Sequence, residues 1–314
     1  MRYGKVAVVV PAHNEERYVA QVIRTVPDFV DLIVAVDDAS TDRTHEILQS
    51  IKDPRLRVVR NDRRMGVGGA IVRGHKEAMA LGSDINVVMA GDGQMDPRYL
   101  EALVRPIFEE GYDFTKGNRF TEKDSLRGMP RLRVLGNAIL GFLTKAASGY
   151  WHIFDPQNGY TAITVSALKR IDLDDVAKDF QFENDLLVRL NVASCRTRDV
   201  AIPAVYGNQQ SKLKVGSFAA KTSLFLVRAF WWRVYRRYML FELHPFAVLL
   251  VSGLLMFVFG LLLGTYMLYL RFWHWPPVSA TAGTVMVAAV PFFLGVQLLV
   301  NALLLDIMES RRLA

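Results

Sequence analysis

The sequence predicts an α/β domain with a mostly parallel sheet flanked by helices, followed by a hairpin of two transmembrane helices. Two observations predict this architecture. The first half alternates between short, continuous apolar runs, typical of buried parallel strands, and amphipathic segments of helical period. The last quarter holds two long segments, 243–270 and 272–305, that contain no Asp, Glu, Lys or Arg. As a helix, each is long enough to cross the ~30 Å hydrocarbon core of a bilayer.

The α/β domain is built from elements that follow one another in a regular order. The predicted strands are the β-rich apolar runs at 5–10, 32–36, 57–60 and 85–89. The predicted helices follow these strands at 15–26, 44–50, 69–80 and 97–109. Such alternation builds a parallel sheet covered on both faces, whose ligands bind at the carboxyl ends of the strands. A strand-like run at 200–206 places the end of this domain near Lys214.

The C-terminal part is predicted to anchor the chain in a membrane. We expect the α/β domain at 1–214, basic interfacial helices at 215–242, and a hairpin at 243–314 with spans at about 244–270 and 278–305. The segment 200–241 contains no acid, and its basic residues are Lys212, Lys214, Lys221, Arg228, Arg233, Arg236 and Arg237. Arg311 and Arg312 follow the second span, whereas the connector carries only Arg271. The positive-inside rule then places both termini and the α/β domain in the cytoplasm.

The basic segment 215–242 is interleaved with aromatic residues and directly precedes a span. Basic aromatic stretches also bind nucleic acid, but this position favours anionic lipid. The segment accounts for much of the net charge of +7. The single cysteine, Cys195, excludes an internal disulfide framework. We therefore expect an integral membrane protein whose partners include a lipid membrane and no nucleic acid. A homo-oligomer is compatible with these features.

Carboxylates follow three of the four predicted strands. Glu15 follows the first, Asp37-Asp38-Ala-Ser-Thr-Asp42 the second, and Asp92-Gly-Gln94-Met-Asp96 the fourth. A single acid in such a place is often a helix cap. Three clusters at one edge of a sheet instead indicate a ligand site, where acids hold a ribose hydroxyl or a hard cation on a diphosphate. The sequence lacks both the Gly-rich dinucleotide fingerprint and the Gly-Lys-Ser/Thr phosphate loop, which argues against an oxidoreductase or an ATPase.

These motifs, together with Pro11-Ala-His-Asn-Glu-Glu16, resemble those of the family 2 inverting glycosyltransferases, which have the GT-A fold. Within that family the chain is similar to the polyprenyl-phosphate glycosyltransferases, the group that contains dolichol-phosphate mannose synthase. The resemblance covers about 5–214 and implies that Pro11, Glu15 and Asp38 surround the nucleotide base and ribose. The whole expected nucleotide-sugar site comprises Pro11, Ala12, His13, Glu15, Asp37, Asp38, Gly69, Asp92 and Lys212.

The resemblance also implies a metal ion on the donor diphosphate. Asp92 and Gln94 match the positions that bind Mg²⁺ or Mn²⁺. The family usually shows Asp-x-Asp here, and its first acid falls at Ala90 in this sequence. Mg²⁺ keeps several waters and needs few protein ligands. We therefore still expect a metal-dependent reaction.

A lipid-phosphate acceptor is already ionised, so its site needs cations more than a base. Arg119, Arg131 and Arg133 are the candidates, because guanidinium groups grip phosphate oxygens in pairs. Glu183 and Asp185 match an acidic motif that supplies the base in relatives with hydroxyl acceptors. Here we expect these two acids to orient the sugar or the arginines. The expected catalytic residues are thus Asp92, Arg119, Arg131, Arg133, Glu183 and Asp185.

The resemblance implies that a hexose passes from a nucleotide-sugar of the GDP-mannose or UDP-glucose type to dolichyl or undecaprenyl phosphate, with inversion. Two alternatives stay open. One is a membrane glycosyltransferase whose acceptor is a sugar hydroxyl. The other is a nucleotide-sugar-binding scaffold or pseudoenzyme, which the replacement of an acid by Ala90 suggests.

Overall fold

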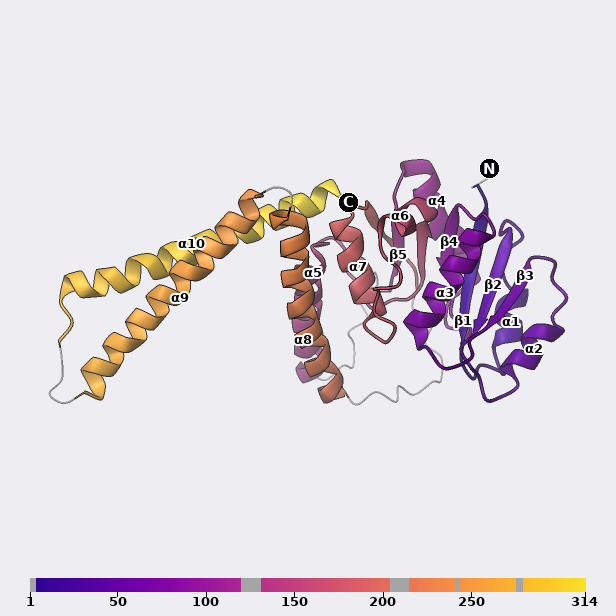
Figure 1. The fold of residues 1–314 in the computed structure, drawn as a ribbon, viewed down its shortest axis with the longest axis horizontal. Helices are drawn as coiled ribbons and strands as arrows, with labels where there is room; N and C mark the ends of the chain where they lie inside the picture. Colours follow the sequence, from indigo (N-terminus) through magenta and orange to yellow (C-terminus); the bar gives the residue numbers. More distant parts are fainter. Residues whose placement is uncertain (1–3, 120–130, 204–214, 241–242, 275–278) are drawn as a thin grey trace. The chain divides into compact units, whose positions relative to one another are not determined.

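The computed structural model describes residues 4–119, 131–203, 215–240, 243–274 and 279–314 (Figure 1). The chain forms two compact units. The first comprises Met1–Trp231 together with Arg312–Ala314, and the second comprises Trp232–Arg311. The first unit holds the sheet and the acidic turns of the α/β domain, so it contains the candidate site.

A mixed, mostly parallel sheet of seven strands forms the centre of the first unit, in the order β3-β2-β1-β4-β6-β5-β7. The strands are β1 Val6–Ala12, β2 Leu32–Asp37, β3 Leu56–Arg60, β4 Ile85–Val88, β5 Phe114–Asn118, β6 Thr161–Thr164 and β7 Thr197–Ala201. β6 runs antiparallel to β4 and to β5, and the other described pairs are parallel. The mostly parallel sheet predicted from the sequence is therefore confirmed. Its strand order reverses beside β1 and β4, where ligands of such sheets bind.

Helices cover both faces of this sheet. They are α1 Val19–Arg24, α2 Thr44–Ser50, α3 Val67–Ala80, η1 Pro97–Tyr99, α4 Leu100–Glu110, α5 Arg131–Ser148, α6 Val165–Arg170 and α7 Phe182–Val192. A further helix, α8 Val215–Arg233, packs on α5 and α7. Alternate residues of β1 enter different cores: Val8 packs with α1 and α4, and Val9 packs with α3. Burial on both faces explains why β1 reads as a continuous apolar run.

Two predicted boundaries were wrong. β1 does not stop before Pro11 but continues to Ala12, because the Pro11 carbonyl still accepts a hydrogen bond from Gly91 N. The first helix begins at Val19 rather than at Glu15. Asn14 has a left-handed backbone with φ of 59°, and a turn follows it. That turn directs Glu15 toward the edge of the sheet instead of into a helix.

The second unit contains a π-helical segment, η3 Val234–Met239, and two long helices, α9 Pro245–Phe272 and α10 Ala282–Arg312. α9 and α10 are long and apolar enough to cross a membrane, with mean hydropathies of 2.8 and 2.1 over 18-residue windows. A Cβ on Gly260 would lie 2.5 Å from Phe292 N, and one on Gly295 would lie 2.4 Å from Phe257 N. Small residues thus let the two backbones touch, as in helix pairs within membranes.

Candidate active site

Two adjoining compartments open at the carboxyl ends of β1 and β4. The acidic compartment has a volume of about 580 Å³, and its lining includes Pro11, Ala12, His13, Glu15, Asp38 and Asp92. The inner compartment has a volume of about 310 Å³, and its lining includes Gln94, Arg119, Asn158, Gly159 and Glu183. Pro11, Val67, Ala90 and Phe180 line both. The cleft therefore has the size of a small-molecule site with two distinct halves.

Asp38 shapes one wall of the acidic compartment. Its carboxylate accepts hydrogen bonds from Asn61 Nδ2 at 2.7 Å, Met65 N at 2.8 Å and Gly66 N at 2.9 Å. These bonds hold the loop that leads into α3, and Met65 and Gly66 themselves line the compartment. His13 lies beside this wall, with Nδ1 2.8 Å from the Asp38 carbonyl oxygen. Asp38 therefore both lines the compartment and holds its wall.

Asp37 and Gly69, both expected at the nucleotide-sugar site, line neither compartment. The Asp37 side chain is fully buried; its carboxylate accepts a hydrogen bond from Ser40 N and lies 3.2 Å from His45 Nδ1 and 3.3 Å from Arg60 Nε. Gly69 N donates to the carbonyl of Lys178 at 3.2 Å. Both residues hold the surrounding loops, and their contact with the donor stays a prediction.

Glu15 and Asp92 bring negative charge to the acidic compartment. Partial burial, followed by the nearby charges of Asp92 and Asp42, raises the pKa of Glu15 to about 7. A cation between these carboxylates would relieve that repulsion. Gln94 N donates to Asp92 Oδ1 at 3.0 Å, and the Gln94 side chain faces the inner compartment.

The residues fit a metal that is bound largely through its substrate. Within the described residues no group of three or more His, Cys, Asp and Glu is arranged to hold an ion. Mg²⁺ in diphosphate sites is commonly held by one or two carboxylates plus phosphate oxygens. Asp92, with Glu15 and Gln94 beside it, meets that requirement.

Arg119 brings positive charge to the inner compartment. Its guanidinium forms a bidentate ion pair with Asp155, with Nε–Oδ2 at 2.7 Å and Nη2–Oδ1 at 3.1 Å. Asp155 is buried, so it fixes the position of this arginine. Arg131 and Arg133 lie in the first turn of α5, and their side chains are outside the described residues, as is Lys212.

The two acids expected at the start of α7 have different surroundings. Glu183 lines the inner compartment, and burial raises the pKa of its carboxyl group while Lys116 opposes that shift. The Asp185 carboxylate instead accepts from Ala177 N at 2.8 Å and Arg189 Nε at 3.0 Å. Asp185 lines neither compartment and holds the loop before α7, and its role toward the substrate stays a prediction.

Lys116, which the sequence analysis missed, lies beneath the inner compartment. This lysine of β5 is fully buried, and its Nζ donates to the Asn158 carbonyl. Burial lowers its pKa, while the charges of Glu183, Asp155 and Asp199 oppose that shift. Asn158 also donates from Nδ2 to the Gly117 carbonyl at 2.9 Å. The sequence of β5, Phe-Thr-Lys-Gly-Asn, has a single apolar side chain, so no periodic pattern marks this lysine as buried.

The sheet order, the acids at the ends of its strands and the two-part cleft define a glycosyltransferase of the GT-A fold. The model of glycosyl transferase family 2 matches residues 7–172. The chain therefore belongs to this family, and the protein is a family 2 glycosyltransferase.

Several relatives are named as enzymes that transfer sugars to polyprenyl phosphates. The chain is 28% identical over 213 residues to UDP-N-acetylglucosamine–dolichyl-phosphate N-acetylglucosaminyltransferase of Methanococcus voltae, covering 63% of this chain and 84% of that protein. It is 27% identical to dolichol-phosphate mannosyltransferase of Pyrococcus furiosus, covering 67% of this chain and 59% of that one. Mannosyl-3-phosphoglycerate synthase from Rubrobacter xylanophilus, at 18% identity, shares the fold with a TM-score of 0.55 over 77% of both chains.

Proposed function

We propose that this protein transfers a sugar from a nucleotide-sugar to a polyprenyl phosphate with inversion at the anomeric carbon. The observation that carries the proposal is the pairing of an acidic compartment with an inner compartment that presents Arg119. The first suits a nucleoside diphosphate that binds with a divalent cation, and the second suits an anionic acceptor. The names of the relatives support an acceptor of this class.

The reaction is a single displacement. A phosphate oxygen of the acceptor attacks the anomeric carbon, the bond from that carbon to the diphosphate breaks, and a nucleoside diphosphate leaves. The acceptor oxygen is ionised at neutral pH, so no residue has to remove a proton from it. Arg119, held by Asp155, orients the acceptor, and Glu183 orients the sugar. Bound Mg²⁺ or Mn²⁺ near Asp92 and Gln94 would neutralise charge on the diphosphate.

A turnover assay tests this proposal. Purified full-length protein is incubated in detergent with a short polyprenyl phosphate, Mg²⁺ or Mn²⁺, and a panel of GDP-mannose, UDP-glucose and UDP-N-acetylglucosamine. Mass spectrometry of the lipid fraction should find polyprenyl phosphate heavier by one sugar with one of these donors. Donor binding without any new lipid species would contradict the proposal. Full activity in excess EDTA would contradict the proposed dependence on a metal ion.

Asp92→Asn tests whether the Asp92 carboxylate contributes to the reaction. Because it removes a charge from the acidic compartment, we expect kcat/KM to fall about 100-fold, with unchanged thermal stability. Asp28→Asn, an exposed acid remote from both compartments, is the control and should behave as the wild type. Equal activity of the two variants would exclude Asp92 from the site.

A second candidate acceptor is a sugar hydroxyl, which needs a general base. The raised pKa of Glu183 and its position in the inner compartment favour this alternative. Glu183→Gln separates the two. With a phosphate acceptor, the variant should mainly raise the KM of the donor. With a hydroxyl acceptor, kcat should fall by about 1,000-fold or more, and the acidic limb of the pH–rate profile should disappear.

We further propose that α9 and α10 span a membrane with both chain termini in the cytoplasm, as the distribution of basic residues suggests. Cys195 is buried, so single cysteines introduced elsewhere can be labelled selectively. A membrane-impermeant maleimide should label Ser279→Cys in intact cells and Ala314→Cys only after lysis. The reverse labelling pattern would place both termini on the outer side of the membrane. Extraction of the protein by alkaline carbonate would show that α9 and α10 do not span it.

A further inference from the structure

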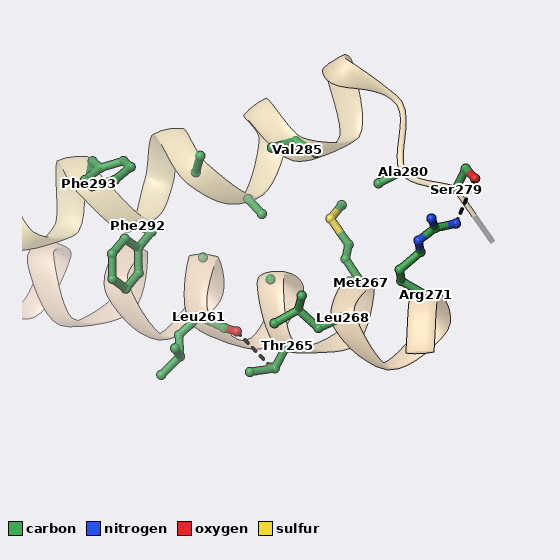
Figure 2. Close-up of a pocket in the computed structure, with 14 residues that line it drawn as sticks. Leu261, Thr265, Met267, Leu268, Arg271, Ser279, Ala280, Val285, Phe292 and Phe293 are labelled. Atoms are coloured by element: carbon green, nitrogen blue, oxygen red, sulfur yellow. Dashed lines mark hydrogen bonds between the residues drawn. The ribbon is translucent and has the colours of Figure 1, made fainter. Parts of the chain in front are cut away.

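An apolar groove lies between α9 and α10 at the end of the pair that carries their connector (Figure 2). Its volume is about 680 Å³. Figure 2 shows Phe292 at one end of the groove, and Arg271 and Ser279 at the other. This groove is distinct from both compartments of the candidate active site, since it shares no lining residue with them.

The groove exists because contact between the helices ends within one turn. At Gly260 an added Cβ would collide with the backbone of Phe292. At Gly264, one turn further along α9, no atom lies within 4 Å of the same position. Gly264 therefore faces open space, and the helices diverge from there toward their connector.

The length of the groove matches one leaflet of a bilayer. Gly260 and Arg271 are eleven residues apart, which corresponds to about 16 Å along a helix, or about half of the ~30 Å hydrocarbon core. Inside hydrocarbon no water is available to fill an apolar space of this size. Its natural occupant is a single hydrocarbon chain that enters from the leaflet around the connector.

The positive charge at the mouth of the groove favours a lipid with an anionic head group. Arg271 is the only charged residue in the sequence from 243 to 305, and Asp306 of α10 pairs with Arg233 instead. Its Nη1 donates to Ser279 Oγ at 3.3 Å, which holds the guanidinium at the mouth of the groove. Exposed Phe272 and Trp273 stand beside it, as aromatic residues do at the level of lipid head groups. Guanidinium groups bind phosphate oxygens in pairs.

We propose that this groove binds an anionic phospholipid of the leaflet around the connector, with one acyl chain between the helices and its phosphate at Arg271. The proposal rests on the membrane-spanning part of the proposed function. It concerns a structural lipid, separate from the polyprenyl-phosphate acceptor.

Native mass spectrometry of the full-length protein, released from nanodiscs of equal phosphatidylglycerol and phosphatidylcholine, tests this site. We expect the wild type to retain one phosphatidylglycerol with about tenfold enrichment over phosphatidylcholine. Gly264→Trp fills the groove and should remove the bound lipid. Leu262→Trp is the matched control, since Leu262 is 63% exposed and outside the groove, and it should keep the lipid.

Arg271→Gln should retain a lipid without the preference for phosphatidylglycerol. Equal enrichment in the wild type and in Gly264→Trp or Arg271→Gln would overturn the proposal. So would release of lipid-free dimers, which would assign the groove to a second copy of the chain. Displacement of phosphatidylglycerol by added polyprenyl phosphate would show that the groove binds the acceptor. This result would also overturn the proposal. Incorporation into nanodiscs reports insertion separately, so a failure of membrane spanning is distinguished from a failure of lipid binding.

Discussion

At the residue scale, neighbouring acids in one motif have different surroundings. Asp37 and Asp38 are adjacent, yet Asp38 lines the acidic compartment and Asp37 is buried against His45 and Arg60. Successive side chains at the end of a strand point to opposite faces, so a motif alone does not say which of two acids meets the ligand. The same holds for Glu183 and Asp185, which occupy different faces of α7.

Lys116 offers a test of the buried charges beneath the inner compartment. Lys116→Met leaves Asp155, Glu183 and Asp199 without this cation, so we expect a loss of about 3–5 kcal/mol in the free energy of unfolding near pH 8. Burial raises the pKa of Asp199 to about 6 in the wild type. At pH 5 the Asp199 carboxyl takes up a proton, so the loss should shrink.

Urea denaturation at pH 5 and pH 8 measures this difference. Lys169→Met, a change at an exposed lysine, is the control and should alter neither value. A loss of stability that is the same at both pH values would contradict the electrostatic role of Lys116.

His75 should make the sheet domain sensitive to acid. It is buried in α3, and this burial lowers its pKa to about 4 from the usual 6.5. The unfolded chain therefore binds a proton below pH 6.5 that the folded chain does not take up until about pH 4. This difference removes up to about 3 kcal/mol of stability as the pH falls through that window.

Chemical denaturation across pH 4–7 tests this expectation. His75→Gln has no titrating group at this position, so its stability should depend less on pH than that of the wild type. Curves with the same slope for both proteins would show that acid sensitivity arises elsewhere.

At the element scale, the periodicity of the sequence predicted most strands and helices of the first 110 residues. The four predicted strands correspond to β1–β4, with ends shifted by one or two residues. The antiparallel direction of β6 between β4 and β5 could not be predicted from the sequence, because pairing direction depends on contacts distant in sequence. Nor could the turn that delays α1, because Asn14 adopts its left-handed conformation beside the residues 40–41 that hold it.

Substitution of alanine for either of two helical glycines should change the stability of the protein in opposite directions. A Cβ on Gly74 of α3 would lie 2.2 Å from Val9 Cγ1 of β1, so Gly74→Ala should destabilise the protein by about 1–3 kcal/mol through overpacking. A Cβ on Gly136 of α5 meets no atom within 4 Å, so Gly136→Ala should stabilise it by up to about 1 kcal/mol. Differential scanning fluorimetry of both variants measures the two shifts. An unchanged or higher melting temperature for Gly74→Ala would contradict the close packing of α3 on β1.

At the scale of the whole molecule, a buried ion pair joins distant parts of the second unit. Arg233 is fully buried, and its Nη1 and Nη2 donate to the Asp306 carboxylate at 2.8 and 3.0 Å. The Tyr238 hydroxyl donates to the same carboxylate at 3.1 Å. The partners are 73 residues apart in the chain, so the pair joins the segment before α9 to the end of α10. Asp306 lies in the part of α10 that extends beyond the predicted end of the span near Leu305.

Asp306→Asn should therefore destabilise the folded protein. It leaves a buried guanidinium without its counter-charge, and we expect a loss of about 3–5 kcal/mol. The double variant Arg233→Met/Asp306→Leu should recover most of this loss, because it removes both charges. Arg236→Met, at an exposed arginine, is the control. Thermal unfolding in detergent measures all three, and a double variant as unstable as Asp306→Asn would contradict the pairing.

The sequence by itself determined the class of the sheet domain, the two apolar helices and the acids at the strand ends, because these follow from local periodicity and from motifs of a few residues. Only the tertiary structure decided which motif residues face the cleft, placed Lys116 beneath it, and paired Arg233 with Asp306. Those outcomes depend on side chains that are tens of residues apart and are buried together only when the chain folds. Burial and the geometry of close contacts, which decide them, leave no pattern within a short stretch of sequence.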